Sequence, residues 1–171
     1  MRVMGIDLGN PGGAAVLTDE GGQGIWPLCV EALPPSLTRL DLQRLVHRLC
    51  KEYRVELVAT EKPGMWGRVS VGMAQREKQG LVRSVCEALK VPLVDYQPQE
   101  IKKAVSGYGR ASKEQMGRCV RMLVRVAATD EHVLDACAIA LVALNRERLR
   151  VTRASQRRLN LRRAPARERR P

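Results

Sequence analysis

The feature that most constrains this chain is a single carboxylate embedded in an apolar segment of helical character. In the stretch TDEHVLDACAIALVAL, residues 129–144, Asp135 follows Val133 and Leu134 and precedes nine consecutive apolar residues. A helix that is apolar on all sides packs inside a protein core, where an unpaired charge costs several kcal/mol. Asp135 must therefore either reach solvent at the start of the helix or face a cation.

The order of the other apolar runs predicts an α/β domain. Five strands are expected, at residues 2–7, 13–17, 24–30, 55–60 and 92–96. Helices are expected at residues 37–49 with Ser36 as N-cap, at 71–89, 98–105 and 112–124, and from 131 to about 148. Three strands followed by alternating helices and strands are typical of a sheet covered by helices.

Two further carboxylates share the unusual position of Asp135. Asp7 closes the first expected strand and Glu61 closes the fourth, so all three acids are expected near the sheet. Each acid alone could be a turn residue or a helix cap, but clustered carboxylates repel one another unless a proton or cation separates them. Mg²⁺ or Mn²⁺ would meet that need, and His132, three residues before Asp135, lies on the same helical face. His132 could equally be a polar residue at the helix start.

Four segments make the chain resemble a known family. GIDLGNPGGAAVL, VATEKPGMWGR, YQPQEIKKAVSGYGRASKEQM and HVLDACAIAL, in this order, resemble the RuvC family of Holliday-junction resolvases over about residues 1–145. The resemblance implies an RNase H-like fold, with a mixed five-stranded sheet flanked by helices. It also implies a homodimer that resolves four-way DNA junctions in recombination and repair, by metal-dependent hydrolysis of phosphodiester bonds. The products would carry 5′-phosphate and 3′-hydroxyl ends.

The resemblance also assigns the catalytic residues. Asp7, Glu61 and Asp135 match the family's acidic residues, and His132 stands where most members have aspartate. Together these four residues would hold two ions of Mg²⁺ or Mn²⁺ and carry catalysis. Imidazole suits Mn²⁺ better than Mg²⁺, so the histidine bears on metal preference. A second departure is Leu8, which replaces the usual proline of the first motif.

Basic and apolar residues near the acids are expected to bind DNA. In the third segment these are Lys102, Lys103, Arg110 and Lys113, which could contact phosphates or simply form a solvated surface. In the loop after Glu61 they are Met65, Trp66 and Arg68. Trp66 or Met65 could act as an apolar wedge at the junction centre, although Trp66 could equally belong to the core.

The positive charge of the chain is concentrated at its end. Residues 146–171 hold eleven arginines and two glutamates, and so carry nine of the twelve net positive charges. With few large apolar residues, this segment is expected to be disordered beyond about Leu149. The sequence thus predicts a nuclease domain at 1–148 and a basic, disordered tail at 149–171. The tail could bind a polyanion or only increase solubility. An acidic membrane surface is a weaker alternative, because the tail lacks the aromatic anchors of an interfacial helix.

Two other functions and the cellular setting remain open at this level. The acids alone do not specify substrate shape, so the chain could cut RNA or branched phage-type DNA, or bind nucleic acid without cutting it. The five cysteines show no C-x-x-C pair and are expected to be buried thiols. No apolar run approaches the roughly 20 residues of a membrane span. We expect no membrane association and a cytoplasmic protein, at the nucleoid or in a host cell if the source is viral; a branch-migration helicase is an open partner.

Overall fold

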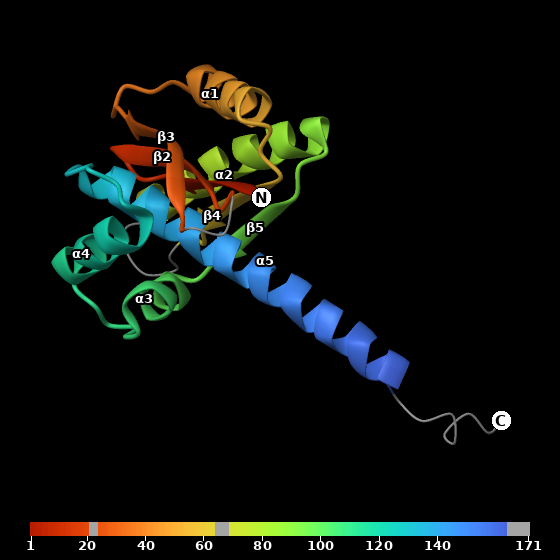
Figure 1. The fold of residues 1–171 in the computed structure, drawn as a ribbon. Coiled ribbons are helices and arrows are strands. Elements are labelled where there is room, and N and C mark those ends of the chain that lie inside the picture. Colours follow the sequence, from red (N-terminus) through yellow and green to blue (C-terminus); the bar gives the residue numbers. More distant parts are fainter. Residues whose placement is uncertain (21–23, 64–68, 164–171) are drawn as a thin grey trace.

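The computed structural model describes residues 1–20, 24–63 and 69–163, and the side chains of these residues except at 69–71 and 158–163 (Figure 1). The strands are β1 (Arg2–Asp7), β2 (Gly12–Thr18), β3 (Trp26–Leu33), β4 (Leu57–Glu61) and β5 (Leu93–Tyr96). The helices are α1 (Arg39–Glu52), α2 (Val69–Leu89), α3 (Pro98–Ser106), α4 (Lys113–Val124) and α5 (Glu131–Arg163).

The strands form one mixed sheet in the order β3-β2-β1-β4-β5. The first three strands are joined as antiparallel neighbours, whereas β1, β4 and β5 run parallel. The mixed five-stranded sheet expected from the sequence is confirmed. Because β1 and β4 are parallel neighbours, the residues that end them lie at the same edge of the sheet.

The helices cover both faces of the sheet. Alternate residues of β1 face opposite ways: Met4 and Ile6 pack with α1 and α2, and Val3 packs with the helices of the other face. In Figure 1, α1 and α2 lie above the sheet, and α3, α4 and α5 lie below it. Two apolar cores result, one on each side.

Helix α5 packs directly against the central strands because two glycines allow close approach. A Cβ at Gly5 would collide with the backbone of Ala136 and Ala140, and a Cβ at Gly13 would collide with the carbonyl of His132. The first turns of α5 therefore rest on β1 and β2 with no side chain between them. This packing carries His132 and Asp135 toward the end of β1.

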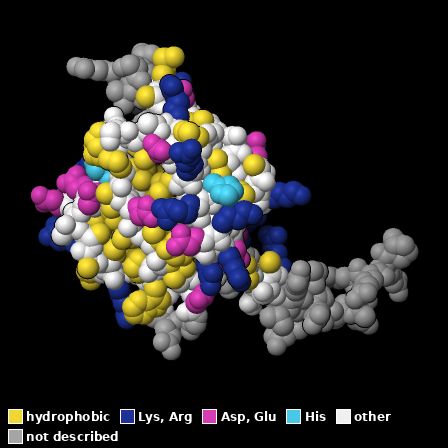
Figure 2. Space-filling model, turned by 90° about the horizontal axis from the view of Figure 1, so that it is seen from above, with side chains coloured by type: hydrophobic (Ala, Val, Ile, Leu, Met, Phe, Trp, Pro, Cys, Tyr) yellow, Lys and Arg dark blue, Asp and Glu magenta, His cyan; other side chains and the backbone are white. Residues whose placement is uncertain are grey.

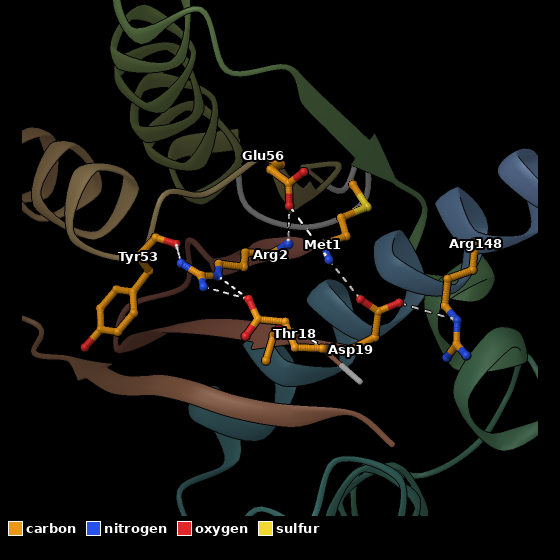
Figure 3. A network of polar contacts seen from close by, with 8 residues as sticks. Met1, Arg2, Thr18, Asp19, Tyr53, Glu56 and Arg148 are labelled. Carbon is orange, nitrogen blue, oxygen red and sulfur yellow. Dashed lines mark hydrogen bonds and ion pairs between the residues drawn. The ribbon is translucent and has the colours of Figure 1, made fainter. Parts of the chain in front are cut away.

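Polar contacts fasten the middle of α5 to the sheet (Figure 3). The carboxylate of Asp19, just after β2, accepts a hydrogen bond from the amino terminus at 3.0 Å and lies 3.5 Å from Nε of Arg148. Beyond Arg148 the helix projects away from the body of the molecule (Figure 1).

The length of α5 differs from the sequence prediction. The apolar pattern predicts an end near Arg148 and disorder after Leu149, but the helix continues to Arg163. The residues from 131 to 163 include no glycine or proline, and the first proline of the segment is Pro165. Low apolar content prevents this segment from joining a core, yet arginine, leucine and alanine favour helix. The structure therefore has helix rather than disordered chain at 149–163, while residues 164–171 lie outside the described residues.

Smaller differences concern element ends and thiols. Thr38, not Ser36, caps α1: its side chain accepts a hydrogen bond from the backbone of Asp41 at 3.1 Å. Strand β3 extends to Leu33, beyond the expected end at residue 30, and β4 begins at Leu57. Of the five cysteines, Cys29 and Cys119 are only partly buried. Within the described ranges, no helix has both the length and the hydropathy that crossing a bilayer requires.

Candidate active site

The site is centred on Asp7, the last residue of β1. Its Oδ1 accepts a hydrogen bond from the backbone N–H of Gly9 at 2.9 Å, and its Oδ2 lies 2.9 Å from Nδ1 of His132. The Asp7 side chain is 17% exposed and that of His132 is 27% exposed. Both oxygens of Asp7 are thus oriented by neighbours while the carboxylate remains open to solvent.

The start of α5 supplies the second and third residues. Asp130 caps the helix, because its Oδ1 accepts hydrogen bonds from the backbone N–H groups of His132 at 2.9 Å and Val133 at 3.1 Å. His132 and Asp135, three residues apart, then project from one face. One potential ligand atom from each of Asp7, His132 and Asp135 lies within 4.8 Å of the others, a grouping that could hold a metal ion.

Glu61, on the adjacent strand, lies beside this group but is not among the residues whose ligand atoms fall within 4.8 Å of one another. Thr60 pairs with Ile6 in the parallel ladder, so Glu61 and Asp7 end neighbouring strands. Burial, together with the charges of Asp7 and Asp135, raises the pKa of Glu61 to about 7. A cleft of about 190 Å³ opens between the two acids; it is lined by Asp7, Leu8, Glu61, Lys62, Pro63, Gln75 and Pro98.

The electrostatics of this cluster suit a divalent cation. Burial and the neighbouring charge of Asp7 also raise the pKa of Asp135. The carboxylates are therefore costly to ionise together, and a hard cation would offset both their desolvation and their repulsion. Three carboxylates and one imidazole form a donor set that Mg²⁺ or Mn²⁺ accepts, and imidazole favours Mn²⁺. The half-buried position of Asp135 is explained if it faces such an ion.

Two of the basic residues expected to bind DNA lie close enough to act on the acids. The charges of Lys102, on α3, and Lys113, on α4, lower the pKa of Glu61. Lys113 Nζ lies 3.2 Å from Glu131 in an exposed ion pair. Lys103 and Arg110 belong to the same segment, and no ion pair involves them within the described part of the chain. Met65, Trp66 and Arg68 lie outside the described residues, so their predicted roles stay predictions.

The structure adds one residue that sequence reasoning missed. Lys78, on α2, donates from Nζ to the carbonyl oxygen of Gly9 at 2.9 Å and lies 3.4 Å from that of Leu8. The ammonium of Lys78 thus fixes the backbone turn that contains Gly9. The N–H of Gly9 in turn donates a hydrogen bond to the carboxylate of Asp7. A lysine in the middle of an amphipathic helix carries no sequence signal for that role, because the hydrogen bond joins residues almost seventy positions apart.

Comparisons with known proteins agree on one family. The family profile described as "Crossover junction endodeoxyribonuclease RuvC" matches residues 3–143. Crossover junction endodeoxyribonuclease RuvC of Thermomicrobium roseum is 31% identical over 153 residues, covering 82% of this chain and 91% of the relative.

Solved structures agree with the sequence comparisons. The structure of Thermus thermophilus RuvC superposes with a TM-score of 0.74 and 26% identity, covering 87% of this chain and 96% of the other. The T. thermophilus RuvC in complex with Holliday junction substrate gives a TM-score of 0.74 and 27% identity, covering 83% and 92%. The RNase H-like resolvase fold expected from the sequence is thereby confirmed.

Proposed function

This chain belongs to the RuvC family of crossover junction endodeoxyribonucleases, and from this membership we propose that it resolves four-way DNA junctions by paired, metal-dependent phosphodiester hydrolysis. The observation that carries the proposal is the convergence of Asp7, His132 and Asp135, with Glu61 beside them at the sheet edge. The match covers 91% of the length of the Thermomicrobium roseum relative.

Asp7, Glu61, His132 and Asp135 are the proposed catalytic residues and metal ligands. When bound, two ions of Mg²⁺ or Mn²⁺ would supply activation of the attacking water and stabilisation of the leaving 3′ oxygen. The chain supplies the orientation of the ligands: the Gly9 N–H fixes one oxygen of Asp7, and the Asp130 cap fixes the start of α5. Glu61, whose pKa lies near neutrality before any cation binds, can exchange its proton under working conditions.

The substrate would be held by basic residues around the site. Lys102, Lys103, Arg110 and Lys113 are proposed to contact phosphates, because their segment borders the acids and Lys102 and Lys113 offset the negative charge there. The segment that holds Met65, Trp66 and Arg68 comes soon after Glu61 in the sequence, and we propose that it contacts the junction centre.

The assembly and setting are part of the same proposal. Paired cuts in a two-fold symmetric junction require two active sites, so we propose a homodimer. We further propose an intracellular protein with a nuclease domain at 1–148 and a basic DNA-binding extension at 149–171. A branch-migration helicase is a proposed partner.

The test is cleavage of a synthetic four-way junction beside a linear duplex and a structured RNA, with Mg²⁺ or Mn²⁺. The wild type should cut the junction in preference to the other two substrates. Asp7→Asn should abolish cutting and keep junction binding, because it removes a ligand charge that also repels phosphate. Asp41→Asn, an equal charge change on α1, is the matched control and should behave like the wild type.

Each other outcome points to a different function. Preferred cutting of RNA or of linear DNA would make the protein a related nuclease with another substrate. Junction binding without any cutting would make it a non-catalytic binder. Normal turnover in Asp7→Asn would overturn the assignment of the site.

A further inference from the structure

Basic side chains lie along α4, beside the candidate active site. Lys113, Gly117 and Arg121 are spaced four residues apart and so share one face of the helix. That face borders a groove of about 320 Å³ between α4 and the start of α5. The groove is lined by Lys113, Glu114, Gly117, Arg118, Arg121, Thr129, Glu131 and Leu134.

The groove is continuous with the site. A smaller hollow shares Lys113, Gly117 and Glu131 with the groove and also includes Asp135. At the buried Gly117 the two helices approach closely, since a Cβ there would come within 3.2 Å of Leu134 Cδ1 and 3.6 Å of an Arg121 guanidinium nitrogen. A path thus leads from Asp135, past the backbone of Gly117, to the guanidinium of Arg121.

The two arginines of the groove differ from the arginines on the opposite side of the molecule. Over the α1 face, basic and acidic side chains alternate (Figure 2), and two arginines there pair with carboxylates: Arg39 with Glu77 and Arg48 with Glu31, each at 2.7 Å. Among the described residues, neither Arg118 nor Arg121 forms an ion pair with an acid. Their charges remain available to an anion.

We propose that this groove binds a second backbone phosphate of the DNA strand being cut, through Arg118 and Arg121. The inference rests on the proposed function, since it takes the scissile phosphate to lie at the acids. Eight residues separate Lys113 from Arg121, a rise of about 12 Å along α4. Successive phosphates of one strand are about 3.4 Å apart along the duplex axis, so this rise is long enough for Lys113 and Arg121 to reach different phosphates. The groove thereby fixes the direction in which the strand leaves the site.

Lys113 lies between the candidate active site and the groove, because it lines both the groove and the hollow that includes Asp135. Its pair with Glu131 is exposed on both sides, at 61% and 65%, and exposed pairs of this kind are weak. Lys113 can therefore exchange Glu131 for a phosphate when the strand enters the groove.

The test compares the double variant Arg118→Gln, Arg121→Gln with the wild type. The control is Arg44→Gln, Lys51→Gln, which removes the same charge from exposed positions on α1. Binding of a fluorescein-labelled four-way junction is measured by anisotropy without divalent ions across a range of KCl concentrations. The groove variant should bind more weakly, and its log-log salt slope should fall by about 0.9 for each phosphate that it no longer neutralises.

A second measurement locates the phosphate. Junctions that carry one neutral methylphosphonate at successive positions beside the cut should include one position that weakens wild-type binding and leaves the groove variant unaffected. An unchanged salt slope, a slope equal to that of the α1 control, or equal sensitivity of both proteins at every position would overturn the proposal. If the wild type bound junctions without cutting them, the proposed function would fail. The salt slope would still test whether Arg118 and Arg121 bind a phosphate.

Discussion

At the scale of single residues, the contact between His132 and Asp7 sets this site apart from an all-carboxylate cluster. Nδ1 of His132 lies 2.9 Å from Oδ2 of Asp7, so the imidazole occupies a position from which it could share a metal ion with that oxygen. A neutral ligand in place of a carboxylate removes one negative charge from the site. The metal preference should reflect that difference.

We therefore predict that the wild type cleaves junctions better with Mn²⁺ than with Mg²⁺. His132→Asp should keep activity and shift the preference toward Mg²⁺, and His132→Ala should be strongly impaired. Single-turnover rates with each metal check this, with His47→Ala on α1 as the control. If His132→Ala cleaved like the wild type with either metal, His132 would be only a polar residue at the start of α5.

The raised pKa of Glu61 makes a separate prediction about stability. In the folded, metal-free protein Glu61 keeps its proton up to about pH 7, whereas the unfolded chain releases it near 4.5. The folded state thus binds more protons between these values, and stability falls as pH rises through that window. Glu61→Gln should raise the free energy of unfolding at pH 8 by about 1–3 kcal/mol, and the gain should vanish near pH 4.

Chemical denaturation of the metal-free proteins across this pH range measures that difference. Glu87→Gln, on the exposed side of α2, is the control and should show no comparable gain at pH 8. Added Mn²⁺ should stabilise the wild type more than Glu61→Gln, because the variant lacks one ligand. If the difference in unfolding free energy between the wild type and Glu61→Gln did not change with pH, the raised pKa of Glu61 would be contradicted.

At the scale of elements, the site depends on how closely α5 approaches β1. Gly5 lies against the backbone of Ala136 and Ala140, so a methyl group at this position would push the helix away. Displacement of the helix would move Asp135 and His132 away from Asp7. Packing and catalytic geometry are coupled where the helix touches the strand.

Gly5→Ala should accordingly lower the free energy of unfolding by about 1–3 kcal/mol or more, as overpacking does. The rise in melting temperature on addition of Mn²⁺ should also be smaller for Gly5→Ala than for the wild type. Gly109→Ala is the matched control, because the nearest atom to its Cβ is the backbone oxygen of Gln99 at an ordinary 3.5 Å. Equal stability of the two variants would show that α5 can move outward without cost.

At the scale of the whole molecule, charge is distributed unevenly along α5. The helix is largely buried from Val133 to Leu144, ion-paired to Asp19 through Arg148, and exposed from Leu149 to Arg157. Its projecting part presents arginines on a helix that lies outside both cores, an arrangement suited to a polyanion. Figure 1 shows this part extending from the body of the molecule.

Removal of residues 150–171 should therefore lower the salt slope of DNA binding, by about 0.9 for each phosphate that the extension neutralises in the full chain. The preference for junctions over linear duplex should persist, and the melting temperature should change little because the described side chains of this segment, at 150–157, are exposed. Anisotropy titrations with both DNA forms test the prediction, and substitution of Arg150, Arg153 and Arg157 by glutamine separates the loss of charge from the loss of chain. An unchanged slope would mean that the extension is only solvated.

The sequence by itself determined the sheet, the order of its helices and the positions of the acids. Apolar runs of period two and of helical period are local patterns, and Asp7, Glu61 and Asp135 stand out because each interrupts or ends such a run. The resemblance then assigned them to one site. Apolar content was a poor guide to the end of α5, because a helix can continue on backbone propensity after its packing has stopped.

Only the tertiary structure decided which groups meet. The approach of His132 to Asp7, the reach of Lys78 to the turn after β1, and the groove beside Gly117 all join residues from different elements. Local patterns cannot specify such distances, because they depend on how closely helices pack on the sheet. Here that closeness follows from the absence of a side chain at Gly5 and Gly13, where α5 touches the strands.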